Sequence, residues 1–472
     1  MPSSPETPLS PPPRERRRLL RWAAVLALVA GLRAAQTWLA SYDDAYITYV
    51  FARSFAAGEG LAWHGERVLG TSSPFTAVLL GTVSRATGLA VPVAGHLLSW
   101  LALWATGVAL LFLTREERIP RAGPVAALLW MIAPATRLHL GSELLPAIAC
   151  VAGAAAAFAA RRDRSAGLLL AAAFAFRAEA GLAAPLLALA VVGRDGPAAA
   201  WRRVARAAGV AIAATAAWLA ALATLQGGAL LPRTLAAKQA QAASSLGIWP
   251  GGWEGLGSAL ARTVELLPGP IPIVLLALTL LALVQLARLR PRPGFHLALL
   301  AWGALHMLLI VLLAVGFYPW YALPLQFALL LLLALAAGGG TAGDDRGTGR
   351  AREAATWLLL GALVGPELMR QSPAQPLRRD SRQEAYGRAA ELFGRYPEGS
   401  RVAAYEVGYL GWASAQRVSD LLGLVSPEVP LDFVRAGDLA AARRHLDPDL
   451  LMLPLNGGSL FGSSVGDAPS FV

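Results

Sequence analysis

Two adjacent carboxylates, Asp43 and Asp44, lie where the first apolar segment of the chain ends. An acid pair next to lipid is costly to place, and ionisable residues in such positions commonly serve a function. A carboxylate within hydrogen-bond reach of a hydroxyl can remove its proton as that hydroxyl attacks. The pair could therefore act as a general base on a substrate anchored in the bilayer. The structural alternative is that Asp43 caps the helix that follows.

Further polar side chains flank the acid pair at regular spacing. Helical spacing relates Tyr42, Tyr46, Tyr49 and Arg53, which predicts one face carrying three phenols and a guanidinium. The extended loop that follows is dense in groups that bind sugars or phosphate, namely Trp63, His64, Glu66 and Arg67. The tyrosines could instead form an interfacial aromatic belt. Capping explains one aspartate, but it does not explain two together with these neighbours, so the functional interpretation is favoured.

The composition indicates an integral membrane protein. Hydrophobic residues make up 56% of the 472 residues and charged residues 15%, with a mean hydropathy of +0.51. Soluble domains carry about a quarter charged residues. The net charge of +11 does not indicate nucleic acid binding, because the arginines cluster in short loops between apolar runs, as in cytoplasmic loops. Cys150 is the only cysteine, which excludes an internal disulfide and a cysteine-based zinc site.

The basic loops predict the topology when all are placed in the cytoplasm. Residues 1–18 are expected to be a disordered cytoplasmic tail, and residues 19–370 a transmembrane domain with a catalytic outer loop at 41–90. The eleven predicted crossings are 19–40, 91–113, 123–141, 144–160, 165–177, 180–193, 207–225, 271–288, 295–315, 321–337 and 355–369. This scheme requires a hairpin near Arg177 and a segment at 74–89 that lies along the outer leaflet. Residues 371–472 then form a small α/β domain outside, with a recognition or lid role.

Four further charged residues fall on the predicted outer side. Arg177 and Glu179 interrupt an alanine-rich run, where an intramembrane charge indicates function; a structural ion pair closing the hairpin explains them equally well. Glu143 starts a helix, where it stabilises the helix dipole. Lys238 could bind a phosphate or be a solvated loop residue. The sequence has no P-loop and no dinucleotide-binding glycine motif.

These motifs together resemble the GT-C membrane glycosyltransferases, nearest to the mycobacterial terminal arabinofuranosyltransferase branch. The most specific block is Asp43 to Tyr49 (DDAYITY). Further matches follow in the expected order: 52–53, 58–61, 65–68, 142–143, 177–179, 232–238, 406–410 and 420–424. The sequence departs from the branch pattern at Val50, Leu69, Thr71 and Ala178. The implied fold is an all-α polytopic GT-C-like domain followed by the small α/β domain.

The resemblance implies transfer of a sugar, for example arabinofuranose, from a polyprenyl-phosphate donor to a cell-envelope glycan or lipid. The site would lie outside the bacterial inner membrane, with the N-terminus in the cytoplasm. Asp43 would be the base, and Asp44 would orient it or the acceptor. The phosphate would be stabilised by Arg53, Lys238 and Arg177, and the sugar or acceptor side would be lined by Trp63, His64, Glu66 and Arg67. No cofactor is firmly implied; a divalent metal beside the carboxylates stays open because no fixed ligand set is present.

Two other functions remain as alternatives. A non-enzymatic carrier or flippase for a lipid-linked glycan would have charges near the membrane midplane and internal repeats. Arg177 and Glu179 fit the first property, but the sequence shows no repeat. An inactive scaffold that retains the fold is the third interpretation.

Overall fold

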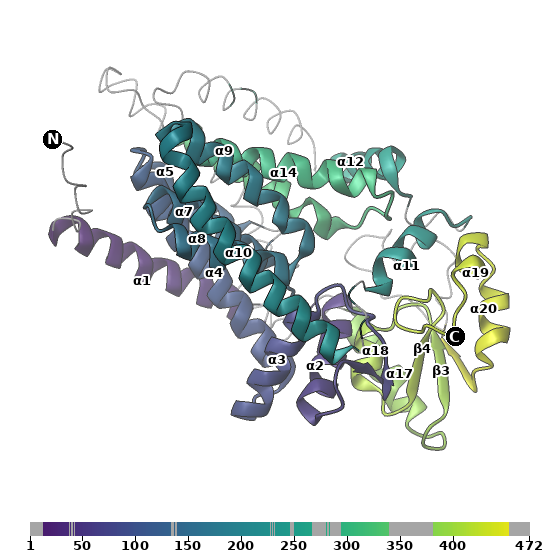
Figure 1. Ribbon diagram of the computed structural model, residues 1–472. Coiled ribbons are helices and arrows are strands. Elements are labelled where there is room, and N and C mark those ends of the chain that lie inside the picture. Colours follow the sequence, from purple (N-terminus) through teal and green to yellow (C-terminus); the bar gives the residue numbers. More distant parts are fainter. Residues whose placement is uncertain are drawn as a thin grey trace, which may run out of the picture.

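The protein consists of a helical bundle with a small α/β domain at one end (Figure 1). The computed structural model describes residues 13–36, 38, 41, 43–133, 136, 139–226, 228, 230, 232–245, 250–266, 280, 283, 294–338 and 381–452. The predicted crossings at 355–369 and, apart from residues 280 and 283, at 271–288 lie outside these residues.

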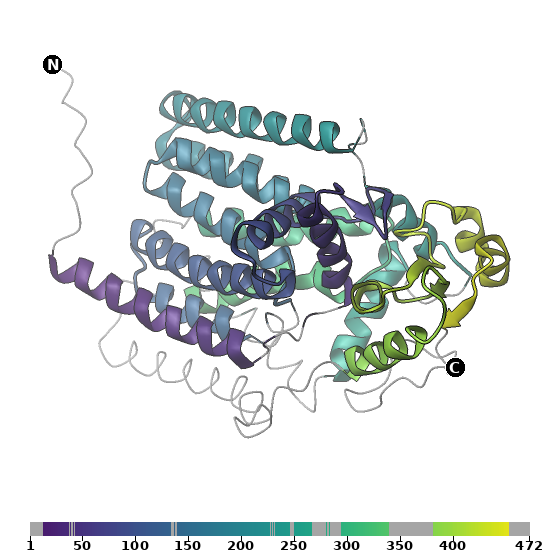
Figure 2. The same cartoon turned by 90° about the horizontal axis from the view of Figure 1, so that it is seen from below.

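The bundle helices form two layers. The first layer runs in the order α1 (Pro13–Gln36), α4 (Val91–Glu116), α7 (Leu144–Ala159), α8 (Asp163–Phe176) and α10 (Pro197–Leu225), as Figure 2 shows. The second contains α5 (Ala122–Ile132), α15 (Leu323–Gly338), α14 (Gly294–Leu312) and α9 (Ala183–Asp195). Small residues allow this close packing. A methyl group on Gly167 of α8, for example, would overlap the carbonyl of Ala207 on α10.

Three described helices, α4, α10 and α14, are long and apolar enough to cross a membrane. The helices at 122–132, 144–159 and 320–335 are apolar but shorter. The number of crossings therefore stays a prediction. The basic run at 14–18 belongs to α1 rather than to a disordered tail, because Pro13 suits a helix start and arginine favours helix.

The predicted hairpin at Arg177 is confirmed. Helix α8 ends at Phe176, and a 3₁₀ turn, η1 (Ala178–Leu182), leads into α9. Arg203 of α10 donates to Asp163 at the start of α8 at 2.9 Å and also pairs with Asp195 at the end of α9. The start of α8 and the end of α9 therefore lie at the same end of the bundle, away from the turn at Arg177.

The other end of the bundle carries the segments that form the site. Helix α2 (Asp43–Ala57) packs against α3 (Pro74–Thr87), and a short hairpin of β1 (Ala62–Trp63) and β2 (Glu66–Arg67) lies between them in sequence. The remaining elements here are α11 (Arg233–Ala242), α12 (Gly252–Leu266) and η2 (Pro319–Ala322). Figure 1 places α2 next to the C-terminal domain, with α3 on the other side of α2.

The C-terminal region is an α/β domain, as the sequence predicts. Its parallel three-stranded sheet has the order β4-β3-β5, with β3 (Arg401–Ala404), β4 (Arg417–Asp420) and β5 (Leu450–Met452). The surrounding helices are α17 (Ser381–Phe393), α18 (Gly408–Ala413), α19 (Leu431–Ala436) and α20 (Leu439–Leu446). One hydrophobic core includes Phe51 of α2 and Trp63 of β1 together with Tyr386 and Val418 of this domain. The domain is therefore packed onto the α2 region.

Candidate functional site

Helix α2 presents two faces with different surroundings. One face, which we call the docking face (Asp43, Tyr46 and Arg53), meets α18 of the C-terminal domain. The Asp43 carboxylate accepts hydrogen bonds from the amides of Gly408 at 3.0 Å and Tyr409 at 2.8 Å. Asp43 therefore caps a helix, as the structural alternative held, but the helix is α18 and not its own. A carboxylate held in this way does not suit the predicted role of base.

The aromatic and basic residues predicted to bind substrate also serve the interface. Tyr46 packs edge-on against Tyr409, with ring centroids 4.7 Å apart. Arg53 donates to the carbonyl of Trp412 at 2.9 Å, and its guanidinium lies 4.6 Å from the ring of that residue. Tyr49 is fully buried, and its hydroxyl donates to the carbonyl of Gly141 at 2.9 Å. These three side chains fix α2 in place, and none of them lines the pocket that lies on the other side of this helix.

The predicted sugar-binding loop is likewise part of the interface. Trp63 donates through Nε1 to the carbonyl of Val418 at 2.7 Å, and Glu66 forms an ion pair with Arg417. His64 lies between them; burial and the nearby Arg53 and Arg417 lower its pKa from 6.5 to about 4. Arg67 is exposed on the same hairpin. None of the four loop residues lines the pocket, because the C-terminal domain covers the hairpin.

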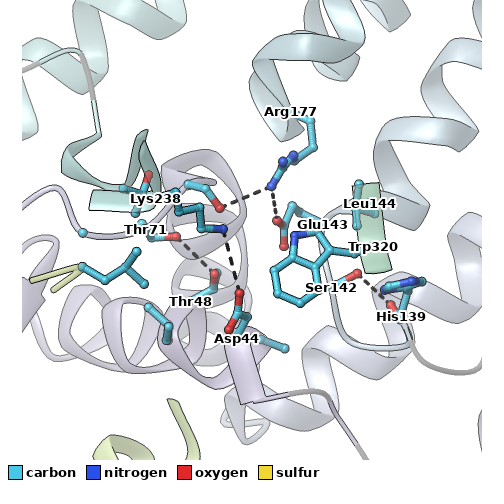
Figure 3. Close-up of a pocket in the computed structure, with 16 residues that line it drawn as sticks. Asp44, Thr48, Thr71, His139, Ser142, Glu143, Leu144, Arg177, Lys238 and Trp320 are labelled. Atoms are coloured by element: carbon cyan, nitrogen blue, oxygen red, sulfur yellow. Dashed lines mark hydrogen bonds and ion pairs between the residues drawn. The ribbon is translucent and has the colours of Figure 1, made fainter. Parts of the chain in front are cut away.

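The opposite side of α2, the pocket face (Asp44, Ile47 and Thr48), lines a pocket that opens to solvent (Figure 3). The empty space in and at the mouth of this pocket is about 530 Å³. The walls of the pocket come from α2, the loop before α3, the turn before α7 and the start of α7, the hairpin turn, α11, η2 and the loop after β4 of the C-terminal domain. The lining residues are Asp44, Ala45, Ile47, Thr48, Gly70, Thr71, Ser72, His139, Ser142, Glu143, Leu144, Arg177, Thr234, Lys238, Trp320 and Leu424. The structure thus brings together four of the predicted residues: Asp44, Glu143, Arg177 and Lys238.

Arg177 is held rigidly at the back of this pocket. Its Nη1 donates to Glu143 Oε1 at 2.9 Å and to Ser72 Oγ at 3.3 Å, and its Nε donates to Glu179 Oε1 at 2.7 Å. Arg177, Glu143 and Glu179 are largely withdrawn from solvent. Breaking such a buried pair leaves an uncompensated charge, which is strongly destabilising. Arg177 therefore forms the buried ion pair of the structural interpretation and also lines the pocket, and its functional role stays a prediction.

Lys238 is the second cation of the pocket, and aromatic rings surround it. Its Nζ lies 4.0 Å from Asp44 Oδ2 and between 5.0 and 5.6 Å from the ring centroids of Tyr318, Trp320 and Tyr321. Cation–π attraction holds an ammonium group over such rings. Lys238 is only 7% exposed, so it is not a solvated loop residue. Two carboxylates already compensate Arg177, whereas Lys238 faces a single carboxylate of the pocket lining at a looser distance.

Sequence reasoning missed the aromatic residues of the pocket. Trp320 lines it, and Tyr318 stacks on Trp320 with centroids 4.5 Å apart. The signal was present as an aromatic run with Pro319 directly before an apolar segment. The hydroxyls of Thr48 and Thr71, which bond each other at 3.1 Å, gave no such signal. Thr71, a position that departs from the resembled branch, thus lies in the pocket.

The described residues contain no group of three or more histidine, cysteine or acidic side chains arranged to hold a metal ion. In the pocket itself, the Asp44 and Glu143 carboxylates are each associated with a cationic side chain.

Comparisons with known proteins support the fold. The chain is similar to the oligosaccharyltransferase AglB of Archaeoglobus fulgidus, with 14% identity, a TM-score of 0.55, and coverage of 93% of this chain and 70% of that one. It is also similar to the arabinofuranosyltransferase AftD from Mycobacteria, with 16% identity, a TM-score of 0.51, and coverage of 88% of this chain and 32% of that one. A family model described as "Domain of unknown function (DUF8728)" matches residues 375–462. A search of curated proteins gives no match.

These similarities establish the fold class. The chain has the helical fold of GT-C membrane glycosyltransferases, with a small domain containing a few strands at its C-terminus. At 14 and 16% identity, the comparisons do not single out the arabinofuranosyltransferase branch.

Proposed function

We propose that this protein transfers a sugar from a polyprenyl-phosphate donor to a hydroxyl group of a glycan or lipid acceptor. The observation that carries the proposal is the pairing of one carboxylate and one ammonium group in one pocket: Asp44 and Lys238 lie 4.0 Å apart on different helices. The GT-C fold supports it, because AglB, which shares this fold, has been solved in complex with a peptide and a dolichol-phosphate.

The reaction needs the two functions that these residues supply. The acceptor oxygen forms a bond to the anomeric carbon while the bond from that carbon to the phosphate oxygen breaks. Asp44 takes the proton of the acceptor hydroxyl as a general base. The leaving polyprenyl phosphate gains negative charge, which Lys238, and behind it Arg177, stabilise. This assignment moves the base from Asp43 to Asp44 and takes Arg53 out of the set of phosphate-binding cations.

The finer features of the proposal follow the sequence resemblance. The sugar is a pentofuranose such as arabinofuranose, and Thr48, Thr71 and Ser142 offer hydroxyls that suit a sugar. Trp320 offers an aromatic face to the same space. The pocket opens outside the bacterial inner membrane, with the N-terminus in the cytoplasm and the C-terminal domain outside.

A carrier or flippase is the second candidate, and the buried Arg177–Glu179 pair favours it. A carrier moves the lipid-linked sugar but leaves the bond between sugar and phosphate intact. Release of the free polyprenyl phosphate therefore separates the two functions.

The test uses the full chain in sealed lipid vesicles with farnesyl-phosphate-linked arabinofuranose as the probe and a panel of glycan acceptors. Wild type should release farnesyl phosphate, and Asp44→Asn should lower the rate by about 10²–10⁴-fold because the base is lost. Lys238→Ala should also lower it, whereas Asp432→Asn, an exposed acid on α19, should not. Undiminished release by Asp44→Asn would show that Asp44 is not the base, and transport without release would support a carrier.

A further inference from the structure

The proposed base, Asp44, and the proposed phosphate-binding cation, Lys238, come from helices that do not pack broadly on each other. Asp44 lies on α2, and Lys238 lies on α11. Among the described elements, α11 makes its broad packing contact with α19 of the C-terminal domain and not with α2 or the bundle. The separation of the two charges must therefore be set by whatever fixes both helices.

Helix α2 is attached to the C-terminal domain at two points. Asp43, at its start, accepts from the first amides of α18, and Arg53, ten residues later, donates to the carbonyls of Gly411 and Trp412 at 3.3 and 2.9 Å. These partners satisfy backbone groups at both ends of α18, which lack partners within the helix. The attachment thus fixes both the position of α2 along α18 and its rotation.

Helix α11 is attached to the same domain by Arg233, at its first turn. The Nε group of Arg233 donates to the carbonyl of Gly423 at 3.0 Å, and Nη2 donates to that of Val429 at 2.7 Å. Both acceptors belong to the loop that follows β4, and Leu424 of that loop lines the pocket. Ser245, beyond the helix, donates to the carbonyl of Ala436 at 2.8 Å.

Outside the domain, the Arg233 amide donates to the carbonyl of Leu69 in the loop before α3. Later in α11, Gln239 donates to the carbonyl of Leu313 at 2.9 Å, and Gln241 accepts from the Tyr318 hydroxyl at 2.6 Å. The domain contacts are therefore the side-chain bonds that hold the first turn of α11.

We propose that the C-terminal domain, residues 381–452, is a positioning domain that sets the separation of Asp44 and Lys238, with Arg233 as the positioning residue on α11. The inference rests on the proposed function for its effect on catalysis. It gives a role to the region that the family model of unknown function matches. The domain also supplies one wall of the pocket through Leu424. Arg233, in contrast, bonds backbone carbonyls of the domain and does not line the pocket.

The chemistry of Arg233 makes the role testable. A guanidinium group binds two carbonyls at once in a fixed geometry, whereas a lysine ammonium group acts as a single point charge. Arg233→Lys therefore keeps the charge and the stem but loses one of the two carbonyl contacts. A displacement of about 1 Å at a site of this kind lowers the rate by up to about 100-fold.

The first measurement reports position without depending on chemistry. Spin labels are attached to Ala57→Cys on α2 and Ala236→Cys on α11, both exposed, in a Cys150→Ala background of the full chain in nanodiscs. Double electron–electron resonance then gives the distance distribution between the two helices. Arg233→Lys and Arg233→Ala should broaden or shift the distribution. The matched control, Arg444→Ala on exposed α20, should leave it unchanged. A distribution that Arg233→Ala does not alter would overturn the proposal.

The second measurement connects position to transfer. With the farnesyl-phosphate probe, Arg233→Lys should lower kcat by about tenfold or more, as expected for a misplaced reacting group, and Arg444→Ala should not. An altered distance with unchanged transfer would overturn the claim that the domain sets the catalytic geometry. If wild type releases no farnesyl phosphate at all, the proposed function fails, and the distance measurement still decides whether the domain positions the helices.

Discussion

The two faces of α2 carry adjacent aspartates in contrasting environments. Asp43 and Asp44 differ by one residue, which rotates a side chain about 100° around a helix. The docking-face carboxylate of Asp43 accepts two backbone amides of α18, whereas the pocket-face carboxylate of Asp44 lines an open space opposite Lys238. Two side chains of the same type, one residue apart, thus differ in partner and in exposure: Asp43 is buried against α18, whereas the Asp44 side chain is 41% exposed. These two properties separate a structural acid from a candidate base.

The largest expected difference is between Asp44→Asn and Asp43→Asn. Asp44→Asn should abolish most transfer with little change in thermal unfolding, because the pocket keeps its shape. Asp43→Asn should lower the stability of docking by about 1–3 kcal/mol, because an amide side chain cannot accept both backbone amides of α18. Transfer and thermal unfolding are measured on the same samples.

The contrast between the faces fails if the two variants show the same profile in both measurements. It is reversed if Asp43→Asn loses transfer while keeping wild-type unfolding and Asp44→Asn does the opposite.

A smaller effect is expected from Gly408→Ala at the docking face. A methyl group at Gly408 would overlap the backbone and carboxylate of Asp43, and backbone cannot move aside cheaply. Overpacking of this kind costs about 1–3 kcal/mol. The control Gly387→Ala adds the same methyl group on α17, where its nearest neighbour, a ring carbon of Tyr409, is 3.8 Å away. The unfolding temperature should fall for Gly408→Ala only. Equal unfolding temperatures of the two variants would contradict the close approach of Gly408 to Asp43.

Local sequence patterns were sufficient to single out the segment at Asp43 and Asp44, to predict the hairpin at Arg177 and to predict the α/β nature of the C-terminal region. It did not distinguish the roles of Asp43 and Asp44, because the partner of Asp43 is 365 residues away in the chain. The same reason applies to Trp63, predicted to bind sugar, and Arg53, predicted to stabilise phosphate, because both residue types also suit a protein interface. A helical spacing shows which residues share a face, but not what that face meets.

The pH dependence of stability provides the next test of the docking face. The pKa of His64 is about 4 in the folded protein, below its ordinary 6.5, because burial and the nearby Arg53 and Arg417 disfavour the charged form. The unfolded chain therefore binds a proton that the folded protein does not. The contribution of neutral His64 to the free energy of unfolding is fully present above pH 6.5 and is lost as the pH falls toward 4. The loss is about 1–2 kcal/mol at pH 5.

His64→Asn removes this titration, and asparagine tolerates the positive φ of 46° at this position. The unfolding temperature should then fall less between pH 7 and pH 5 than in wild type. Identical pH profiles would show that His64 does not report on the interface.

The smallest effect is expected from Arg53→Ala, which separates docking from phosphate binding. Its guanidinium bonds two carbonyls of α18 and lies over Trp412, so its loss should lower docking stability by about 1 kcal/mol. Arg67→Ala, an exposed arginine on the neighbouring hairpin, is the control. If Arg53 acts through docking, the KM for the farnesyl-phosphate probe should stay near the wild-type value while unfolding shifts. If Arg53 bound the phosphate, KM would rise without a change in unfolding, and the docking face would then belong to the substrate site after all.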